Sequence, residues 1–127
     1  MNFYIVIPAH NEEAYIARTL KSLTRQSLLP KKIVVVNDNS SDSTASIVDD
    51  FTRQFDFVSM VNLKSSDVHL PGSKIIKAFQ AGIDQLDTNY DVICKFDADL
   101  IFPTNYLERI AFLFNNDQTI GMASGFC

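Results

Sequence analysis

Short runs of β-branched and aromatic residues alternate along the chain with longer segments in which apolar residues recur every three or four positions. The short runs predict β-strands and the longer segments predict helices. The predicted strands are Phe3–Ile7, Lys32–Val36, Phe57–Asn62 and Asp91–Phe96, with a weaker one near Thr119–Phe126.

Each gap between predicted strands holds one amphipathic helix, and suitable capping or first-turn residues precede each apolar stripe. For the first helix, Glu12 and Glu13 are expected in the first turn, where acidic side chains complement the helix dipole. The expected starts are Asn11, Asp42 or Ser43, Gly72-Ser73, and Pro103 in the first turn of the fourth helix. The stripes are Ile16, Leu20, Leu23; Ile47, Val48, Phe51, Phe55; Ile75, Phe79, Ile83, Leu86; and Leu107, Ile110, Phe114.

The alternation of strands and helices predicts an α/β fold with a mainly parallel sheet, helices on both faces and right-handed crossovers. In such Rossmann-like sheets, ligands bind at the carboxyl ends of the strands. Three polar clusters follow strands there, namely His10-Asn11-Glu12, Asn37–Asp42 and Asp97-Ala98-Asp99. We therefore expect the three clusters to meet on one rim of the sheet.

Composition narrows the class of protein. A chain of 127 residues with 46% hydrophobic residues fits one globular domain, residues 1–127. Its apolar runs are far shorter than the ~20 residues of a membrane span and no basic segment precedes them, so a cytoplasmic protein without a signal peptide is expected. A net charge of -4, with no basic cluster longer than Lys31-Lys32, argues against a nucleic-acid partner. Cys94 and Cys127 are expected to be reduced thiols.

The pair Asp97 and Asp99 carries the clearest candidate chemistry. In extended backbone, two residues that flank a third point to the same side, so both carboxylates could serve one ligand. Asp99 is then the candidate ligand for Mg²⁺ or Mn²⁺, and Asp97 an acceptor for a sugar hydroxyl or a base. The alternative is that both are turn or helix-capping aspartates before Pro103.

The other rim residues have both functional and structural interpretations. Asp38 follows the second strand, where it either accepts a base N–H, as uracil and guanine offer, or forms a turn. Glu12 either contacts ligand or complements a helix dipole, whereas Glu13 and Asp42 fit dipole and capping roles better. His10 lacks a second His or Cys at metal-ligand spacing, so it is not interpreted as a zinc ligand.

Residues 64–72 form the longest expected loop and border the same rim. The segment Leu70-Pro71-Gly72-Ser73-Lys74 is similar to a loop that closes on a phosphate, with Lys74 adding positive potential. It lacks the P-loop pattern, and a solvated helix lysine is the open alternative for Lys74.

Three segments together resemble the N-terminal half of a family-two glycosyltransferase of the GT-A type. Ile5–Glu13 reads I-V-I-P-A-H-N-E-E, Val34–Asp42 reads V-V-V-N-D-N-S-S-D, and Phe96–Asp99 reads F-D-A-D. Their order and separations match the family, and the resemblance covers almost the whole chain. It implies a GT-A fold and a hexosyltransferase-type reaction, in which a sugar passes from a UDP-sugar or GDP-sugar to an acceptor hydroxyl with inversion.

The resemblance also assigns roles to individual positions. The residues after the first strand line the base and ribose, Asp38 contacts the base, Asp97 touches the nucleoside, and Asp99 coordinates the Mn²⁺ or Mg²⁺ that bridges the diphosphate. The family commonly has Asp where this chain has Asn37, which weakens the second motif slightly. The expected donor-binding residues are Pro8, Ala9, Asn11, Glu12, Asp38, Lys74, Asp97 and Asp99.

In this family the general base and the acceptor site lie in the second half of the domain, which the resemblance places downstream of Cys127. We therefore expect an incomplete domain that holds donor and metal, contains no catalytic base and is inactive alone. Uncovered sheet surface is expected to promote self-association, and any membrane association would come through the missing part. The sequence does not indicate the donor sugar or the acceptor.

Two other classes remain as alternatives. A haloacid-dehalogenase-type phosphatase also uses D-x-D with Mg²⁺, but normally after the first strand and followed by Thr. A receiver-like phospho-switch needs an acidic pair after the first strand, where Pro8-Ala9-His10 stands, and an Asp after the third, where Asn62-Leu63 stands. Nucleotidyltransferases and dinucleotide-binding domains open with glycine-rich loops, and no glycine precedes Gly72.

Overall fold

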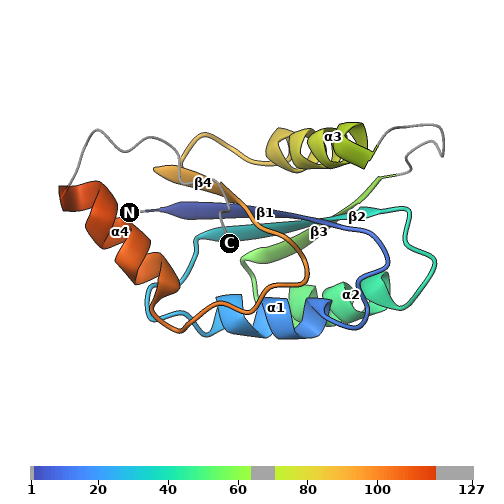
Figure 1. The fold of residues 1–127 in the computed structure, drawn as a ribbon, viewed down its shortest axis with the longest axis horizontal. Coiled ribbons are helices and arrows are strands. Elements are labelled where there is room, and N and C mark those ends of the chain that lie inside the picture. The colour runs from blue at the N-terminus through green and yellow to red at the C-terminus, as the bar shows by residue number, and fades with distance from the viewer. Residues whose placement is uncertain (1, 64–70, 117–127) are drawn as a thin grey trace.

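The computed structural model describes residues 2–63 and 71–116, and for residues 71–75, 115 and 116 only the backbone. Four strands form one parallel sheet in the order β3-β2-β1-β4 (Figure 1). The elements are β1 (Phe3–Ala9), α1 (Ile16–Thr24), β2 (Lys32–Asp38), α2 (Thr44–Gln54), β3 (Val58–Leu63), α3 (Pro71–Asp84), β4 (Val92–Lys95) and α4 (Tyr106–Asn116).

The alternation of side chains along β1 divides the core into two layers. Phe3, Ile5 and Ile7 face the side covered by α1 and α2, together with buried residues of α4. Val6 faces the opposite side, where it packs with Ala78 of α3. Figure 1 shows α3 alone above the sheet and α1 and α2 below it. The expected α/β architecture with helices on both faces is therefore confirmed.

Gly82 lets helix α3 pack directly against the sheet. A Cβ atom added at this position would lie 2.5 Å from Cγ1 of Val6 and 3.0 Å from Cγ2 of Val36, so any larger residue would push the helix away. This approach brings α3, with Ala78 buried beneath it, over the centre of the sheet. Helix α3 thus covers the space beyond the carboxyl ends of the strands.

The four main strand predictions are confirmed to within two residues at each end. The weaker strand near Thr119–Phe126 and the loop residues 64–70 lie outside the described residues. Three helix starts differ: α1 begins at Ile16, α3 at Pro71 and α4 at Tyr106.

The expected cap of the first helix and the expected first-turn position of Pro103 in the fourth helix are wrong. Asn11 has a positive φ of 51°, and Tyr15 occupies the N-cap position of α1, so Glu12 and Glu13 lie before its first turn. Pro103 precedes the fourth helix instead of sitting in its first turn, with its carbonyl accepting the N–H of Tyr106 at 3.1 Å. No helix in the part of the chain described here is long and apolar enough to cross a membrane.

Candidate functional site

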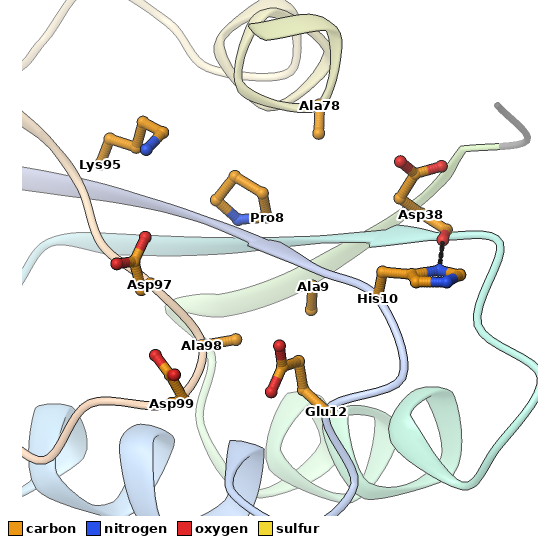
Figure 2. Close-up of a pocket in the computed structure, with 10 residues that line it drawn as sticks. All are labelled: Pro8, Ala9, His10, Glu12, Asp38, Ala78, Lys95, Asp97, Ala98 and Asp99. Atoms are coloured by element: carbon orange, nitrogen blue, oxygen red, sulfur yellow. Dashed lines mark hydrogen bonds between the residues drawn. The ribbon is translucent and has the colours of Figure 1, made fainter. Parts of the chain in front are cut away.

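The strand order creates a crevice beside β1. The chain adds β2 and then β3 on one side of β1, crosses the sheet through α3, and places β4 on the other side of β1. Ligands of open α/β sheets bind at such a switch point, outside the carboxyl ends of the strands. A pocket of about 360 Å³ lies there, within the size range of small-molecule sites. It is lined by Pro8, Ala9, His10, Glu12, Asp38, Ala78, Lys95, Asp97, Ala98 and Asp99 (Figure 2).

Acidic side chains gather at one end of this pocket. Figure 2 shows Glu12, Asp97 and Asp99 around Ala98, with the carboxylate of Glu12 pointing towards the loop that follows β4. Burial raises the pKa of Glu12, and the negative charges of Asp99, Asp42 and Asp97 raise it further, against an opposing effect of His10. This end of the pocket therefore has an excess of negative charge that a bound cation would relieve.

The sequence predicts extended backbone at Asp97 and Asp99, but the structure has a turn there. Residues 98 and 99 form a turn, yet both carboxylates line the same pocket. The buried carbonyl of Ala98 accepts a hydrogen bond from the Thr19 hydroxyl at 2.9 Å. That contact ties the turn to α1, and the two flanking carboxylates line the pocket.

At the other end of the pocket lies Asp38, the last residue of β2. Asp38 is only 6% exposed, and its Oδ1 atom has no hydrogen-bond partner among the described residues. The main-chain oxygen of Asp38 lies 2.6 Å from Nδ1 of His10. Because a carbonyl can only accept, Nδ1 carries the proton, which leaves Nε2 to accept from the amide of Asn11 at 3.4 Å. Asp38 thus lines the pocket with its main-chain oxygen already bound and one side-chain oxygen unpartnered.

The loops after β1 and β2 are joined by reciprocal hydrogen bonds. The N–H of Ser41 donates to Oδ1 of Asn11 at 2.8 Å, and the N–H of Asn11 donates to the Ser40 hydroxyl at 3.0 Å. The N–H of Ser43 donates to Oε2 of Glu13 at 2.9 Å. These contacts use residues that the sequence assigned to helix ends, and they hold the two loops as one unit.

Asp42 strengthens this connection from the second loop. Its Oδ1 accepts from the N–H and the hydroxyl of Thr44, at 2.9 and 2.5 Å, and its Oδ2 accepts from the N–H of Glu13 at 3.3 Å. Burial tends to raise the pKa of Asp42, but the hydrogen bonds from Thr44 and Glu13 outweigh it and lower the pKa below its usual value. Ser43 occupies the N-cap position of α2 without a capping hydrogen bond from its side chain, and Asp42, the residue before it, binds the first N–H of the helix instead.

Most of the expected donor-binding residues meet in the pocket. The residues brought together are Pro8, Ala9, Glu12, Asp38, Asp97 and Asp99. Asn11 is absent from the pocket lining because its side chain joins the two loops, and the side chain of Lys74 lies outside the described residues. Lys95 was missed, although it lies two residues before Asp97, a spacing that places alternate strand residues on one side.

The carboxylate oxygens at the acidic end of the pocket fit a cation that is held partly by the protein and partly by a bound ligand. Among the described residues, no group of three or more His, Cys, Asp or Glu side chains could hold a metal ion alone. Mg²⁺ sites of phosphate-binding enzymes typically use one or two carboxylates together with substrate phosphates. The exposed carboxylates of Asp97 and Asp99, beside the charge-crowded Glu12, match that pattern.

Comparison with known proteins identifies the family. The family model for glycosyl transferase family 2 matches residues 4–125. The chain belongs to this family. A family 2 member with a D-x-D segment after the fourth strand is neither a haloacid-dehalogenase-type phosphatase nor a receiver domain, so both alternatives are wrong.

Relatives and solved structures agree with the family 2 assignment. The chain is 38% identical to the "Probable glycosyltransferase YdaM" of Bacillus subtilis over 95% of its length, and 28% identical to a poly-beta-1,6-N-acetyl-D-glucosamine synthase of Staphylococcus epidermidis. It is similar in structure to S. aureus TarS in complex with UDP, with a TM-score of 0.75 and 26% identity over 93% of this chain.

A mannosyltransferase from Pyrobaculum calidifontis, solved with GDP-Man and Mn²⁺, shares the fold with a TM-score of 0.69 at 20% identity. The family 2 chain spans only part of these proteins: 28% of the B. subtilis relative, 33% of the TarS chain and 34% of the mannosyltransferase.

Proposed function

We propose that this family 2 domain binds a UDP-sugar or GDP-sugar in the switch-point pocket and serves the transfer of that sugar, with inversion, to an acceptor hydroxyl. The observation that carries the proposal is the division of one pocket into two chemically different ends. A buried, unpartnered acceptor, Asp38, lies at one end, and the carboxylates of Glu12, Asp97 and Asp99 lie at the other. A nucleoside diphosphate has an N–H-bearing base at one end and anionic phosphates at the other.

The base is assigned to the Asp38 end. An unpaired buried carboxylate oxygen can accept the ring N–H that uracil and guanine both carry, and adenine lacks such a group at the corresponding position. Pro8 and Ala9, at the end of β1, line the pocket between the two ends (Figure 2). Complexes of relatives support this orientation only through their ligand class, since TarS was solved with UDP.

The diphosphate is assigned to the acidic end together with Mn²⁺ or Mg²⁺, for which Asp99 is the proposed ligand. A bound divalent ion would neutralise the charge that develops on the departing nucleoside diphosphate. Asp97 would accept hydrogen bonds from the nucleoside or sugar. Lys95 also lines the pocket and offers a positive charge close to the same end.

Inversion requires a general base on the acceptor hydroxyl, and we assign none among residues 1–127. Every carboxylate that lines the pocket already has a role in donor binding. We propose that the base and the acceptor site belong to the part of a longer enzyme that the relatives contain beyond the matched segment. Residues 1–127 would then bind donor without transferring its sugar.

The metal assignment is tested by replacing Asp99 with Ala. We expect D99A to lose most of the gain in UDP affinity that Mn²⁺ gives, while binding without metal stays close to that of the parent. Isothermal titration calorimetry with and without Mn²⁺ measures both quantities. The control is D50A, which removes an exposed carboxylate on α2, away from this pocket. Equal Mn²⁺-dependent affinity in D99A and the parent would remove Asp99 from the metal site.

A further inference from the structure

Helix α1 carries a polar stripe beside its apolar one. Thr19 and Ser22 are three residues apart and share one face of α1, and Gln26 follows two residues after the helix ends at Thr24. Thr19 is 0% exposed and Gln26 is 4% exposed, although polar side chains are seldom buried so completely. Each of these side chains has a hydrogen-bond partner in the segment that follows β4, besides a main-chain carbonyl of α1.

The partners lie in order along residues 98–107. The Thr19 hydroxyl donates to the Ala98 carbonyl at 2.9 Å. The N–H of Phe102 donates to the Ser22 hydroxyl at 3.0 Å. We call these three side chains the polar ladder of α1; its last member, Gln26, donates to the Pro103 carbonyl at 2.6 Å and accepts from the N–H of Leu107 at 3.0 Å.

These bonds replace the regular hydrogen bonding that the segment lacks. Residues 96–105 belong to no helix or strand, and three of their backbone groups, the Ala98 and Pro103 carbonyls and the N–H of Phe102, are bound by the ladder side chains. Of the three ladder residues, Thr19 alone contacts the peptide between Asp97 and Asp99. The hydroxyl has one proton, and the Ala98 carbonyl is nearer than the alternative acceptor in its own helix, the Tyr15 carbonyl at 3.3 Å.

We propose that Thr19 is a positioning residue for the metal-binding turn: its buried hydroxyl fixes the Ala98 carbonyl and thereby aims the carboxylates of Asp97 and Asp99 at the diphosphate end of the pocket. Ala98 sits at the centre of the turn and is itself buried, so the orientation of its peptide group sets the direction of both neighbours. Binding groups work only when a second set of contacts holds them in place. This inference rests on the proposed function of Asp99.

The test compares three variants of α1. T19V keeps the shape of the side chain and removes the hydroxyl, whereas T19S keeps the hydroxyl. The matched control is T24V, because the Thr24 hydroxyl bonds only to the Leu20 and Lys21 carbonyls of the same helix. We expect T19V to lose about tenfold or more of the Mn²⁺-dependent UDP affinity and to keep its metal-free affinity, as loss of an outer partner of a metal ligand typically does. T19S and T24V should retain both.

A second measurement separates this inference from the proposed function. Amide hydrogen exchange of residues 98–102 in the ligand-free protein should be faster in T19V than in the parent, T19S or T24V. If the parent showed no Mn²⁺-dependent nucleotide binding, the proposed function would fail, and unchanged exchange in T19V would then overturn the ladder contact separately. If the parent binds with Mn²⁺ and T19V binds equally well, the positioning role is wrong. T19A removes the same hydroxyl and replaces T19V in both measurements if the valine chain does not fold.

Discussion

At the scale of single residues, Asp38 stands out because a side-chain oxygen lacks a hydrogen-bond partner among the described residues. It is buried at the end of β2 with an unpartnered Oδ1, a situation it shares with Asn37 among the described residues. A buried acceptor without a partner costs about 1–3 kcal/mol, and such groups in native proteins call for an explanation. Asn37 does not line the pocket, whereas Asp38 does, so we assign a ligand-binding role only to the second.

Replacing Asp38 with Asn should relax base discrimination. The amide keeps the size of the side chain but can donate as well as accept, so it no longer requires an N–H on the base. We expect the preference for the favoured nucleoside diphosphate over ADP to fall by about 1.5–3 kcal/mol, roughly 10- to 150-fold. Calorimetry of UDP, GDP and ADP at fixed Mn²⁺ measures the preference.

The matched control for this change is D56N, an exposed residue before β3 that lines no part of the pocket. It should leave the ranking of the three nucleotides unchanged. A uniform loss of affinity for all three nucleotides in D38N would show that Asp38 forms the turn and does not contact the base.

At the scale of elements, Asp87 joins the loop between α3 and β4 to the start of the sheet. Its carboxylate accepts from Lys32 of β2 at 2.7 Å, from the Tyr4 hydroxyl of β1, and from the N–H of Asn89 at 2.9 Å. The hydrogen bonds from Lys32, Tyr4 and Asn89 lower the pKa of Asp87 well below its ordinary value, and burial only partly opposes them. The ionised carboxylate therefore stabilises the junction through which the chain crosses to β4.

This junction predicts a defined response to acid. Because the pKa of Asp87 is lowered on folding, its contribution to stability is fully present above the ordinary value of 3.8 and is lost progressively as the pH falls below it. D87N should be less stable than the parent at pH 7, and the gap in melting temperature should narrow as the pH falls from about 5 to about 2. Thermal unfolding monitored by circular dichroism across this range measures the gap.

The control, D84N, changes an exposed aspartate at the end of α3 and leaves the partners of Lys32 and Tyr4 in place. Its melting temperature should follow that of the parent at each pH. A gap between D87N and the parent that stays constant from pH 7 to pH 2 would contradict the role given to the ionised carboxylate.

Elements with a strong local signal were predictable, and contacts between distant segments were not. The strands follow from continuous β-branched runs such as Ile33–Val36, and the face of α1 follows from the spacing of Ile16, Leu20 and Leu23. Most pocket residues were also predictable, because parallel strands bring their carboxyl ends to one rim. The bond between Asn11 and Ser41 spans 30 residues, and that between Thr19 and Ala98 spans 79. No local pattern indicates either.

At the scale of the whole molecule, the two ends of the pocket come from different stretches of the chain. The end at Asp38 depends on β1, β2 and the two joined loops, which lie within residues 3–44. The end at Asp97 and Asp99 depends on β4, whose one partner among the described strands is β1. Tyr4 pairs with Lys32 in one ladder and with Ile93 in the other, so the second pairing closes a much longer loop.

We therefore expect the part of the sheet at the Asp38 end of the pocket to fold before the part at the Asp97 and Asp99 end. Contacts between distant residues form later, because closing a long loop costs entropy before the contact repays it. In refolding followed by pulse-labelled hydrogen exchange, amides of the β1–β2 ladder should gain protection before those of Val92–Lys95. Simultaneous protection of both sets would show that the sheet condenses in one step. The same set of amides in the urea-unfolded chain gives the unprotected reference.

The polar ladder of α1 has a consequence for the chain while it is still being synthesised. Until β4 emerges, the face of α1 that will receive residues 98–107 must remain in contact with water. Thr19, Ser22 and Gln26 can hydrogen-bond to water during that interval, whereas an apolar stripe at the same positions would expose a surface prone to aggregation. The side chains that later hold the turn of Asp97 and Asp99 would thus also protect the partly synthesised chain from aggregation.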